Sequence, residues 1–443
     1  MGVNLVIGRS GTGKTEHCLR DILRQLEADP LGPPIHWIVP DQATFVLERR
    51  LMAASPRGGF SRCRIVSFEL LAQDILAQAG GAAVPQVTPL GRQMILGHLL
   101  RRFRGELRYF DRVVQHASLA SCLDTALAEL ERGGATPDQL QAAINGLSRE
   151  NDADAQALAD KLHDLHLLFC AYGNYLGQER LDPWRRMRQV LDCLAGGRWT
   201  SAGDIYVDGF FTFTEWERRL LAGLAQTCPQ LTLTLLMDPD SPALDPAAGP
   251  PDELSCFHRV ERAWRRLREV FLSAGVQINA PLLLRQQHRL AAPCLSHVEA
   301  RLFAPGRQAD VASDQLDLVE APNRRAEVDA AARHIRGLLA QGMRLRDILV
   351  LARNLDDYRD LIAASFAEHG IRFFADRRRS MAHHPLLQLL RSALAVAQLG
   401  WPRSAVMAIA RSGLAGLSPD DADQLENYLL AHRFVGEAAW TPA

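Results

Sequence analysis

Val3–Thr15, with the sequence VNLVIGRSGTGKT, is the stretch that decides the fold of this chain. It opens with an apolar run typical of a buried strand and passes near Gly13 into a helical pattern. Between the two, Gly8–Thr15 fits the pattern GxxxxGK followed by Ser or Thr. In this pattern glycines let backbone N–H groups turn toward phosphate oxygens at a helix N-terminus. The stretch predicts a phosphate-binding loop on a parallel α/β sheet.

The residue types in this loop fit ATP and Mg²⁺. Lys14 would reach the β- and γ-phosphates, and the Thr15 hydroxyl would bind Mg²⁺. Only Lys14 and Lys161 are lysines among 50 basic residues, and Lys14 stands where a compact ammonium suits a phosphate. The predicted nucleotide-binding residues are Gly8, Arg9, Ser10, Gly11, Thr12, Gly13, Lys14 and Thr15. The alternative is a glycine-rich turn that binds no ligand.

An acidic residue follows a later strand. Asp204–Val207 is predicted to be a buried strand, and Asp208 comes directly after it, where P-loop proteins place a carboxylate for Mg²⁺. The next residue is Gly209 rather than a glutamate that would orient an attacking water. Thr15 and Asp208 are therefore the predicted magnesium ligands, acting through the bound nucleotide, and weak hydrolysis is expected. A plain turn residue is the alternative for Asp208.

Strand-like and helical patterns alternate on both sides of a long helical stretch. Strands are expected at residues 3–7, 35–39, 64–68, 204–207 and 231–236, with helices near 13–28, 43–54 and 215–226. This alternation is typical of a parallel sheet covered on both faces. Residues 85–200 carry apolar residues at helical spacing throughout, which predicts a helical domain inserted into the α/β domain.

The remaining residues predict the start of a second α/β domain. Apolar runs at 315–320, 348–352 and 371–375 are expected to be strands, with helices near 324–340 and 356–368. Because the chain ends without a closing element, it is expected to be the front part of a longer protein.

Composition excludes several classes of protein. The 443 residues are 47% hydrophobic and 23% charged, with a net charge of −1. Such values are ordinary for a soluble globular protein of about two to four domains. No apolar run approaches the ~20 residues that a membrane span needs, and the N-terminus lacks the pattern of a signal peptide. A cytoplasmic location is therefore expected.

Several motifs occur in the order found in one family. Besides Gly8–Thr15 they are VPDQATF (Val39–Phe45), VSFELLAQDIL (Val66–Leu76), YVDGFFTFTEWE (Tyr206–Glu217), APNRRAEVDAAARHI (Ala321–Ile335), RDILVLARNLDDY (Arg346–Tyr358) and FFADRRRSMAHHPL (Phe373–Leu386). Across nearly the whole chain this series resembles the AddB subunits of the bacterial AddAB helicase–nucleases. The resemblance implies a degenerate superfamily 1 helicase fold, related to the UvrD-type motors.

The resemblance also implies a division into helicase domains. Residues 1–84 and 201–300 would form the P-loop domain 1A, residues 85–200 the inserted helical domain 1B, and residues 301–443 the start of domain 2A. Three features of active motors are missing from the sequence. No glutamine-bearing motif precedes the P-loop, Gly209 occupies the position of a glutamate, and Leu235–Ala243 stands where motors carry a GDxxQ element. The resemblance thus implies a subunit that binds, or once bound, nucleotide and guides DNA, while the partner subunit is the motor that moves along the DNA.

AddB-type subunits also read a recombination hotspot sequence in single-stranded DNA. The positions that match those used for reading are Gln42, Thr44, Phe68 and Phe210. Amide and hydroxyl groups can hydrogen-bond base edges, and each stacked ring contributes about 1–3 kcal/mol per base. Leu70 and Gln73 stand where members often carry Arg and Trp, which leaves the recognised sequence open. Core packing at strand ends is the alternative for the two phenylalanines.

The expected function is that of the AddB-type subunit of an ATP-dependent helicase/deoxyribonuclease that processes double-strand DNA breaks for recombinational repair. It would pair with an AddA-type subunit, bind single-stranded DNA and break ends, and associate with the bacterial nucleoid. Arg377–Arg379 could bind phosphates of single-stranded DNA, and a solvated loop is the alternative for them. The family's nuclease site and its 4Fe–4S cluster are expected only beyond Ala443, so no catalytic residue is assigned in this chain. The alternatives are a non-hydrolysing scanning scaffold and, less favoured, a P-loop small-molecule kinase.

Overall fold

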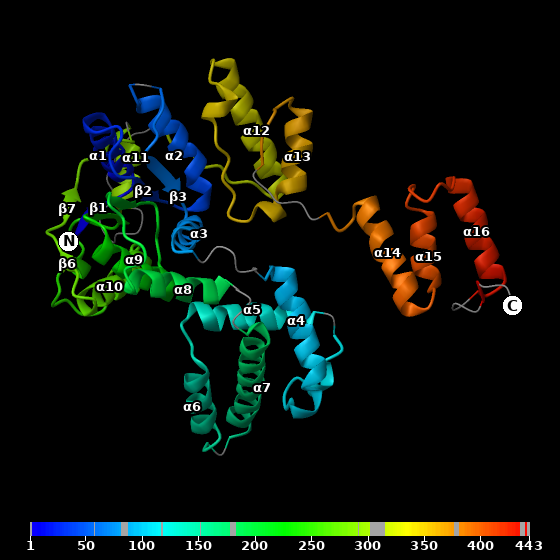
Figure 1. The fold of residues 1–443 in the computed structure, drawn as a ribbon. Helices are drawn as coiled ribbons and strands as arrows, with labels where there is room; N and C mark the ends of the chain where they lie inside the picture. Colours follow the sequence, from blue (N-terminus) through cyan, green and yellow to red (C-terminus); the bar gives the residue numbers. More distant parts are fainter. Residues whose placement is uncertain are drawn as a thin grey trace. The chain divides into compact units, whose positions relative to one another are not determined.

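The computed structural model of the chain describes residues 2–56, 58–80, 87–116, 118–150, 152–177, 183–290, 292–301, 315–375, 381–434 and 439–440 (Figure 1). The chain falls into two compact units, Met1–Leu316 and Asp317–Ala443. The first unit carries the P-loop and is built on a parallel sheet. The second is helical and irregular in the part that the structure describes.

Parallel strands form the sheet of the first unit. They are β1 (Gly2–Gly8), β2 (Ile35–Ile38), β3 (Cys63–Val66), β4 (Ile205–Val207), β5 (Gln230–Leu236), β6 (Gln277–Ile278) and β7 (Leu282–Leu284). Their order is β3-β2-β4-β5-β1-β6, and β7 also pairs with β1. Gly8, at the end of β1, is paired with Leu236 on one side and Leu284 on the other. The predicted parallel sheet is confirmed, and two short strands that the sequence did not reveal lie beside β1.

Helices cover both faces of this sheet. On one face α1 (Lys14–Ala28) and α2 (Asp41–Ala54) share an apolar core with the strands around Trp37. A larger core on the other face includes α3 (Phe68–Gln78), α8 (Pro183–Ala195), α9 (Glu215–Thr227) and α10 (His258–Ser273). The short helices η3 (Pro242–Leu244) and α11 (Pro293–Arg301) complete the sheet domain. No helix in the described parts of the chain is long and apolar enough to cross a membrane.

A polar cluster fixes α1, the helix that follows the P-loop, against the sheet. Tyr206 on β4 donates its hydroxyl hydrogen to Asp21 on α1. Gln25, one turn further along, donates to the Tyr206 oxygen at 2.8 Å and to Asp204 at 2.9 Å. Burial raises the pKa of the Tyr206 phenol, so the hydroxyl keeps its proton as a donor. The cluster therefore holds the second half of α1 in place beside β4.

Residues 85–200 are helical where the structure describes them, as predicted. The helices are α4 (Pro89–Arg102), α5 (Leu119–Arg132), α6 (Pro137–Leu147), α7 (Ala153–Leu176) and α8, with the short turns η1 (Arg104–Glu106) and η2 (Asp111–Val113) after α4. The helices α4, α5 and α7 share an apolar core of their own around Leu96, Leu127 and Leu168. Where this region ends as a domain stays a prediction.

A buried carboxylate organises the turn between α4 and α5. Asp164 on α7 has no exposed surface. Its oxygens accept hydrogen bonds from three successive backbone N–H groups, those of Arg108, Tyr109 and Phe110, at 2.8, 2.8 and 2.9 Å. Because a buried carboxylate needs hydrogen-bond donors, these three bonds tie the turn to the long helix.

The second unit differs from the prediction. Its helices are α12 (Arg324–Ala340), α13 (Arg359–Glu368), α14 (Pro385–Leu399), α15 (Arg403–Ala410) and α16 (Pro419–Ala431), with the short turns η4 (Leu345–Asp347) and η5 (Leu355–Asp357). The strands predicted at 315–320, 348–352 and 371–375 are wrong, because these segments are irregular. Each is apolar, but none has a neighbouring strand among the described residues, and Leu318, Leu351 and Phe374 are 100%, 89% and 89% exposed. The α/β assignment holds for the first unit alone.

Candidate functional site

The P-loop lies at the carboxyl end of β1, between Gly8 and the first residue of α1, Lys14. Gly11 and Gly13 have φ angles of +82° and +91°, a left-handed conformation that residues with a side chain rarely adopt. Turns of this kind let successive N–H groups face one concavity, and the N-terminus of α1 adds partial positive charge there. The loop therefore fits a phosphate group.

Lys14 lies inside this concavity. Its ammonium donates hydrogen bonds to the carbonyl oxygens of Gly8 and Arg9, both at 2.8 Å. Burial lowers the pKa of Lys14 to about 8; the Asp208 carboxylate opposes this shift, and Arg289 adds to it. A phosphate in the concavity would offer the ammonium a charged acceptor, which makes a stronger hydrogen bond than a carbonyl oxygen does.

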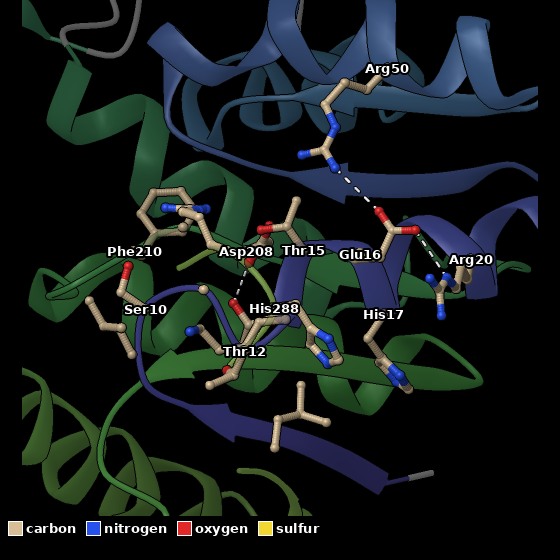
Figure 2. Close-up of a pocket in the computed structure, with 18 of the residues that line it drawn as sticks. Ser10, Thr12, Thr15, Glu16, His17, Arg20, Arg50, Asp208, Phe210 and His288 are labelled. Carbon is tan, nitrogen blue, oxygen red and sulfur yellow. Dashed lines mark hydrogen bonds and ion pairs between the residues drawn. The ribbon is translucent and has the colours of Figure 1, made fainter. Parts of the chain in front are cut away.

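Asp208 lies at the carboxyl end of β4 and is 4% exposed. One of its oxygens accepts a hydrogen bond from the Thr234 hydroxyl at 2.5 Å (Figure 2). Its N–H donates to the Ile38 carbonyl oxygen at 3.0 Å. Asp208 and Thr15 line the same pocket. A carboxylate and a hydroxyl are ligands that Mg²⁺ accepts beside nucleotide phosphates. Among the described residues, no three His, Cys, Asp or Glu side chains gather into a metal site of their own.

The backbone after Asp208 explains why glutamate is missing there. Gly209 has a φ of +87°, and a Cβ at this position would lie 3.3 Å from the ring of Pro40. A glutamate would be strained in this left-handed conformation by about 1–2 kcal/mol. The next two acids are engaged at the start of α9. Glu215 pairs with two arginines of that helix, and Glu217 accepts a hydrogen bond from the N-cap residue at 2.7 Å.

Several side chains that the sequence analysis missed form the rim of this pocket, which has a volume of about 630 Å³. They are Glu16, His17, Arg20, Arg50, His288 and Arg289. The Glu16 carboxylate is shared between Arg20 at 3.0 Å and Arg50 at 3.2 Å, as Figure 2 shows. The cations outnumber the acids, which suits a polyphosphate. Glu16 and Arg20 lie four positions apart on the helix that follows the loop, which was a usable signal, whereas Arg50 and His288 come from distant segments.

The segment after β7 crosses the P-loop. Gln287 donates to the carbonyl oxygen of Ser10 at 2.6 Å, and the N–H of His288 donates to that of Gly11 at 3.0 Å. A Cβ at Gly8 would come within 2.8 Å of the Leu284 carbonyl oxygen, so this approach requires glycine. No local pattern predicts a contact across 277 positions; it follows from the pairing of β7 with β1.

Arg9 has its side chain engaged outside the concavity. The guanidinium donates to Asp238 at 3.0 Å and to Glu299 at 2.9 Å, and it lies 5.3 Å from the centre of the Phe257 ring. These partners neutralise its charge. Of the predicted nucleotide-binding residues, Arg9 would therefore meet a phosphate through its backbone.

The four predicted DNA contacts lie in segments that follow β2, β3 and β4. In the first turn of α2, Gln42 is exposed, and the Thr44 hydroxyl donates to the Asp41 carbonyl oxygen at 2.8 Å. Phe68 is 6% exposed, and its ring centre is 4.9 Å from that of Phe210. Core packing thus accounts for most of the Phe68 side chain, whereas Phe210 is half-buried. Phe210 also lines the P-loop pocket and two further pockets.

A second pocket, of about 620 Å³, lies beside these rings. Its lining includes the apolar side chains of Phe68, Phe210, Trp216 and Met187. Polar groups of Asp41 and Thr214 also reach it. This mixture of apolar faces and polar edges is what a nucleobase needs. The predicted phosphate contacts Arg377–Arg379 lie outside the described residues.

Comparison with known proteins gives a consistent result. A family model described as ADDB, N-terminal, matches residues 5–299. The chain is similar to proteins named as the B subunit of an ATP-dependent helicase/deoxyribonuclease. It is 37% identical to that of Pelotomaculum thermopropionicum, over 100% of this chain and 38% of the relative. The identity to the protein of Symbiobacterium thermophilum is 36%, over 98% of this chain and 37% of the relative. The identity to the protein of Geobacillus kaustophilus is 34%, over 100% of this chain and 38% of the relative. The chain thus spans less than two fifths of the length of these relatives.

Proposed function

Because this chain belongs to the AddB family, we propose that it is the nucleotide-binding part of the AddB-type subunit of an ATP-dependent helicase/deoxyribonuclease. It would bind ATP and Mg²⁺ at the P-loop and guide single-stranded DNA along the carboxyl edge of the sheet, where a hotspot sequence is read. The complete enzyme, assembled with an AddA-type subunit in the bacterial cytoplasm at the nucleoid, would process double-strand DNA breaks for recombinational repair.

The geometry around the P-loop carries this proposal. Lys14, Thr15 and Asp208 line one pocket, next to turns that glycine adopts most easily. Gly209, held in a left-handed conformation, stands where hydrolases carry a glutamate. This combination supports binding of nucleotide with slow turnover, the property of a degenerate motor. The family match favours a helicase–nuclease subunit over a small-molecule kinase.

The DNA role is supported by the place of the aromatic pocket. Ligands of open parallel sheets bind beyond the carboxyl ends of the strands. Phe210 follows β4 at that edge and lines both the nucleotide pocket and the pocket beside Phe68. A base stacked on Phe210 would therefore lie next to a bound nucleotide. In this arrangement Phe68 is a positioning residue that supports the Phe210 ring from behind.

The nuclease chemistry belongs, in this proposal, to the part of the relatives that the chain does not match. The relatives are more than twice as long as the region aligned with this chain. The resemblance assigns to that remaining part a carboxylate–lysine nuclease site and a 4Fe–4S cluster held by cysteines. We therefore assign no residue of this chain to DNA cleavage.

Replacing Phe210 with alanine is expected to weaken binding of single-stranded oligonucleotides about fivefold to a hundredfold, the loss of one stacked base. Replacing Phe68 with alanine is expected to lower the free energy of unfolding by about 3 kcal/mol, because it opens a cavity in the core. The measurements are fluorescence anisotropy with labelled oligonucleotides of several sequences, and denaturant unfolding of each variant.

A Phe68→Leu variant serves as the matched control, since it fills most of the same space and should keep both stability and DNA affinity near those of the parent. If Phe210→Ala lowered stability as much as Phe68→Ala and left DNA affinity unchanged, both rings would be core residues. Equal weakening on every sequence would assign the ring to stacking without sequence reading.

A further inference from the structure

The helix α10 exposes a face rich in arginine, although the chain as a whole has a net charge of only −1. The arginine face consists of Arg259, Arg262, Arg265, Arg266 and Arg268. Arg259, Arg262 and Arg266 are exposed, and Arg265 and Arg268 are half-buried. Of the two glutamates on α10, Glu261 is buried and accepts a hydrogen bond from Ser241 at 2.6 Å. The Glu261 carboxylate is therefore turned away from the arginine face. Glu269 is exposed beside this face, but among the residues that the structure describes it forms no ion pair with any of the five arginines.

In the part of the chain that the structure describes, the arginines of this face have no acidic partners. In the same unit Arg9, Arg64, Arg92 and Arg186 all form ion pairs with Asp or Glu. Within the described residues, by contrast, no hydrogen bond or ion pair joins any guanidinium of the arginine face to another side chain. The positive charge of this face is therefore available to a negatively charged ligand.

A pocket of about 800 Å³ lies at the start of α10. Phe257, the N-cap residue, and Arg259 line one side of it, and Phe210 and Phe211 line another. The Phe211 side chain is 55% exposed, which is a large apolar surface to leave in water. The pocket thus joins an exposed aromatic ring to the first guanidinium of the arginine face.

We propose that this pocket and the arginine face form a binding path for single-stranded nucleic acid, in which Phe211 stacks a base and Arg259, Arg262 and Arg266 neutralise phosphates. The inference rests on the proposed function, and it adds a phosphate-binding surface to the pocket beside Phe68. Arg259 and Arg266 are separated by seven positions, so these three arginines extend over about 10 Å along the helix axis.

Nucleic acid is favoured over an acidic protein surface for two reasons. An exposed aromatic ring beside a row of cations provides both contacts that a single strand needs, base stacking and charge neutralisation. Phe211 also follows Phe210 directly in the sequence. A DNA strand that leaves the pocket beside Phe68 would therefore meet the Phe211 ring first and then the arginine face. An acidic protein surface would use the cations but would leave Phe211 without a role.

The test replaces Arg259, Arg262 and Arg266 together with glutamine in the full 443-residue chain. Each phosphate contact on a single strand contributes about 0.7 to the slope of log affinity against log salt, so the slope should fall by about 2. Affinity for an oligothymidylate should fall about a hundredfold at about 0.1 M salt. Anisotropy titrations across a range of salt concentrations measure both quantities.

The matched control replaces Arg101, Arg149 and Arg198, three exposed arginines elsewhere in the same unit, with glutamine. It removes the same charge, and it should keep the slope near that of the parent. Equal losses in both triple variants would show a general charge effect and overturn the proposal. An unchanged slope in the α10 variant would overturn it too. Loss of binding to the AddA-type partner, with oligothymidylate affinity intact, would assign the face to a protein and also overturn it.

A second measurement does not depend on the folding of a variant. Oligothymidylate carrying 5-iodouracil, photo-crosslinked to the unmodified chain, should label Phe211 itself, which fragment-ion sequencing of the labelled peptide distinguishes from the adjacent Phe210. Labelling confined to the pocket beside Phe68 would contradict this inference but leave the proposed function standing. A chain that bound no single-stranded DNA at all would contradict both.

Discussion

Replacing Lys14 with alanine should weaken binding of ATP with Mg²⁺ about tenfold to a hundredfold, because a hydrogen bond from a charged group contributes about 1.5–3 kcal/mol. The ammonium lies in the P-loop, bonded to the carbonyl oxygens of Gly8 and Arg9. Titration with a fluorescent ATP analogue measures the change. A loss of less than twofold would mean that the loop does not direct this lysine at the phosphates.

The affinity of the parent chain should also depend on pH in a defined direction. Burial lowers the pKa of Lys14 to about 8 in the free protein, and phosphates favour the charged form. Binding strength is therefore fully present well below about pH 8 and falls by up to about tenfold per pH unit above it. The Lys14→Ala variant is the control, since it retains only the pH dependence of the nucleotide and of other groups. Parallel profiles for the two proteins would contradict the assignment.

Replacing Asp164 with alanine should lower the free energy of unfolding by about 3–5 kcal/mol. The carboxylate is fully buried and accepts hydrogen bonds from three backbone N–H groups, of Arg108, Tyr109 and Phe110. A hydrogen bond to a charged group contributes about 1.5–3 kcal/mol. Denaturant unfolding, with hydrogen exchange of the three amides, measures the loss.

Asp160 provides the control for this prediction, because it lies one helical turn earlier on α7 and makes only side-chain contacts, with Arg108 at 3.7 Å and with the Gln156 amide at 3.2 Å. Its replacement with alanine should change stability by less than about 1 kcal/mol. If the two variants lost equal stability, the buried carboxylate would have no special role. A helical region that lost order in the Asp164 variant while the sheet stayed folded would show that the two cores unfold separately.

The parts of the fold that could be predicted are those with local signals. The apolar run of β1 followed by glycine, lysine and threonine was enough to place the P-loop, and the next strands followed from their apolar runs. Phe68 was assigned to the end of a strand, but it begins α3, because the Ser67 hydroxyl caps that helix by accepting from the Leu70 N–H at 3.4 Å. In the second unit the apolar segments were real, but a strand also needs a hydrogen-bonding neighbour.

The candidate site divides in the same way. The loop residues and Asp208 lie next to strand ends and could be found from spacing. Arg50, His288 and Arg289 reach the pocket only through tertiary contacts, and the pairing of β7 with β1 that delivers the last two depends on a strand of three residues. The arginine face of α10 was visible in the sequence as a charge run. Its lack of acidic partners, however, is a property of the folded chain.

A single-turnover experiment tests the central claim, that the chain binds nucleotide without driving a motor. The chain is mixed in excess with radiolabelled ATP and Mg²⁺, and bound nucleotide and released phosphate are followed in the same samples. We expect nearly complete binding, with phosphate released more slowly than about 0.1 per second, because Gly209 replaces the glutamate; enzymes commonly reach about 10 per second. Release at tens per second, or no binding at all, would contradict it.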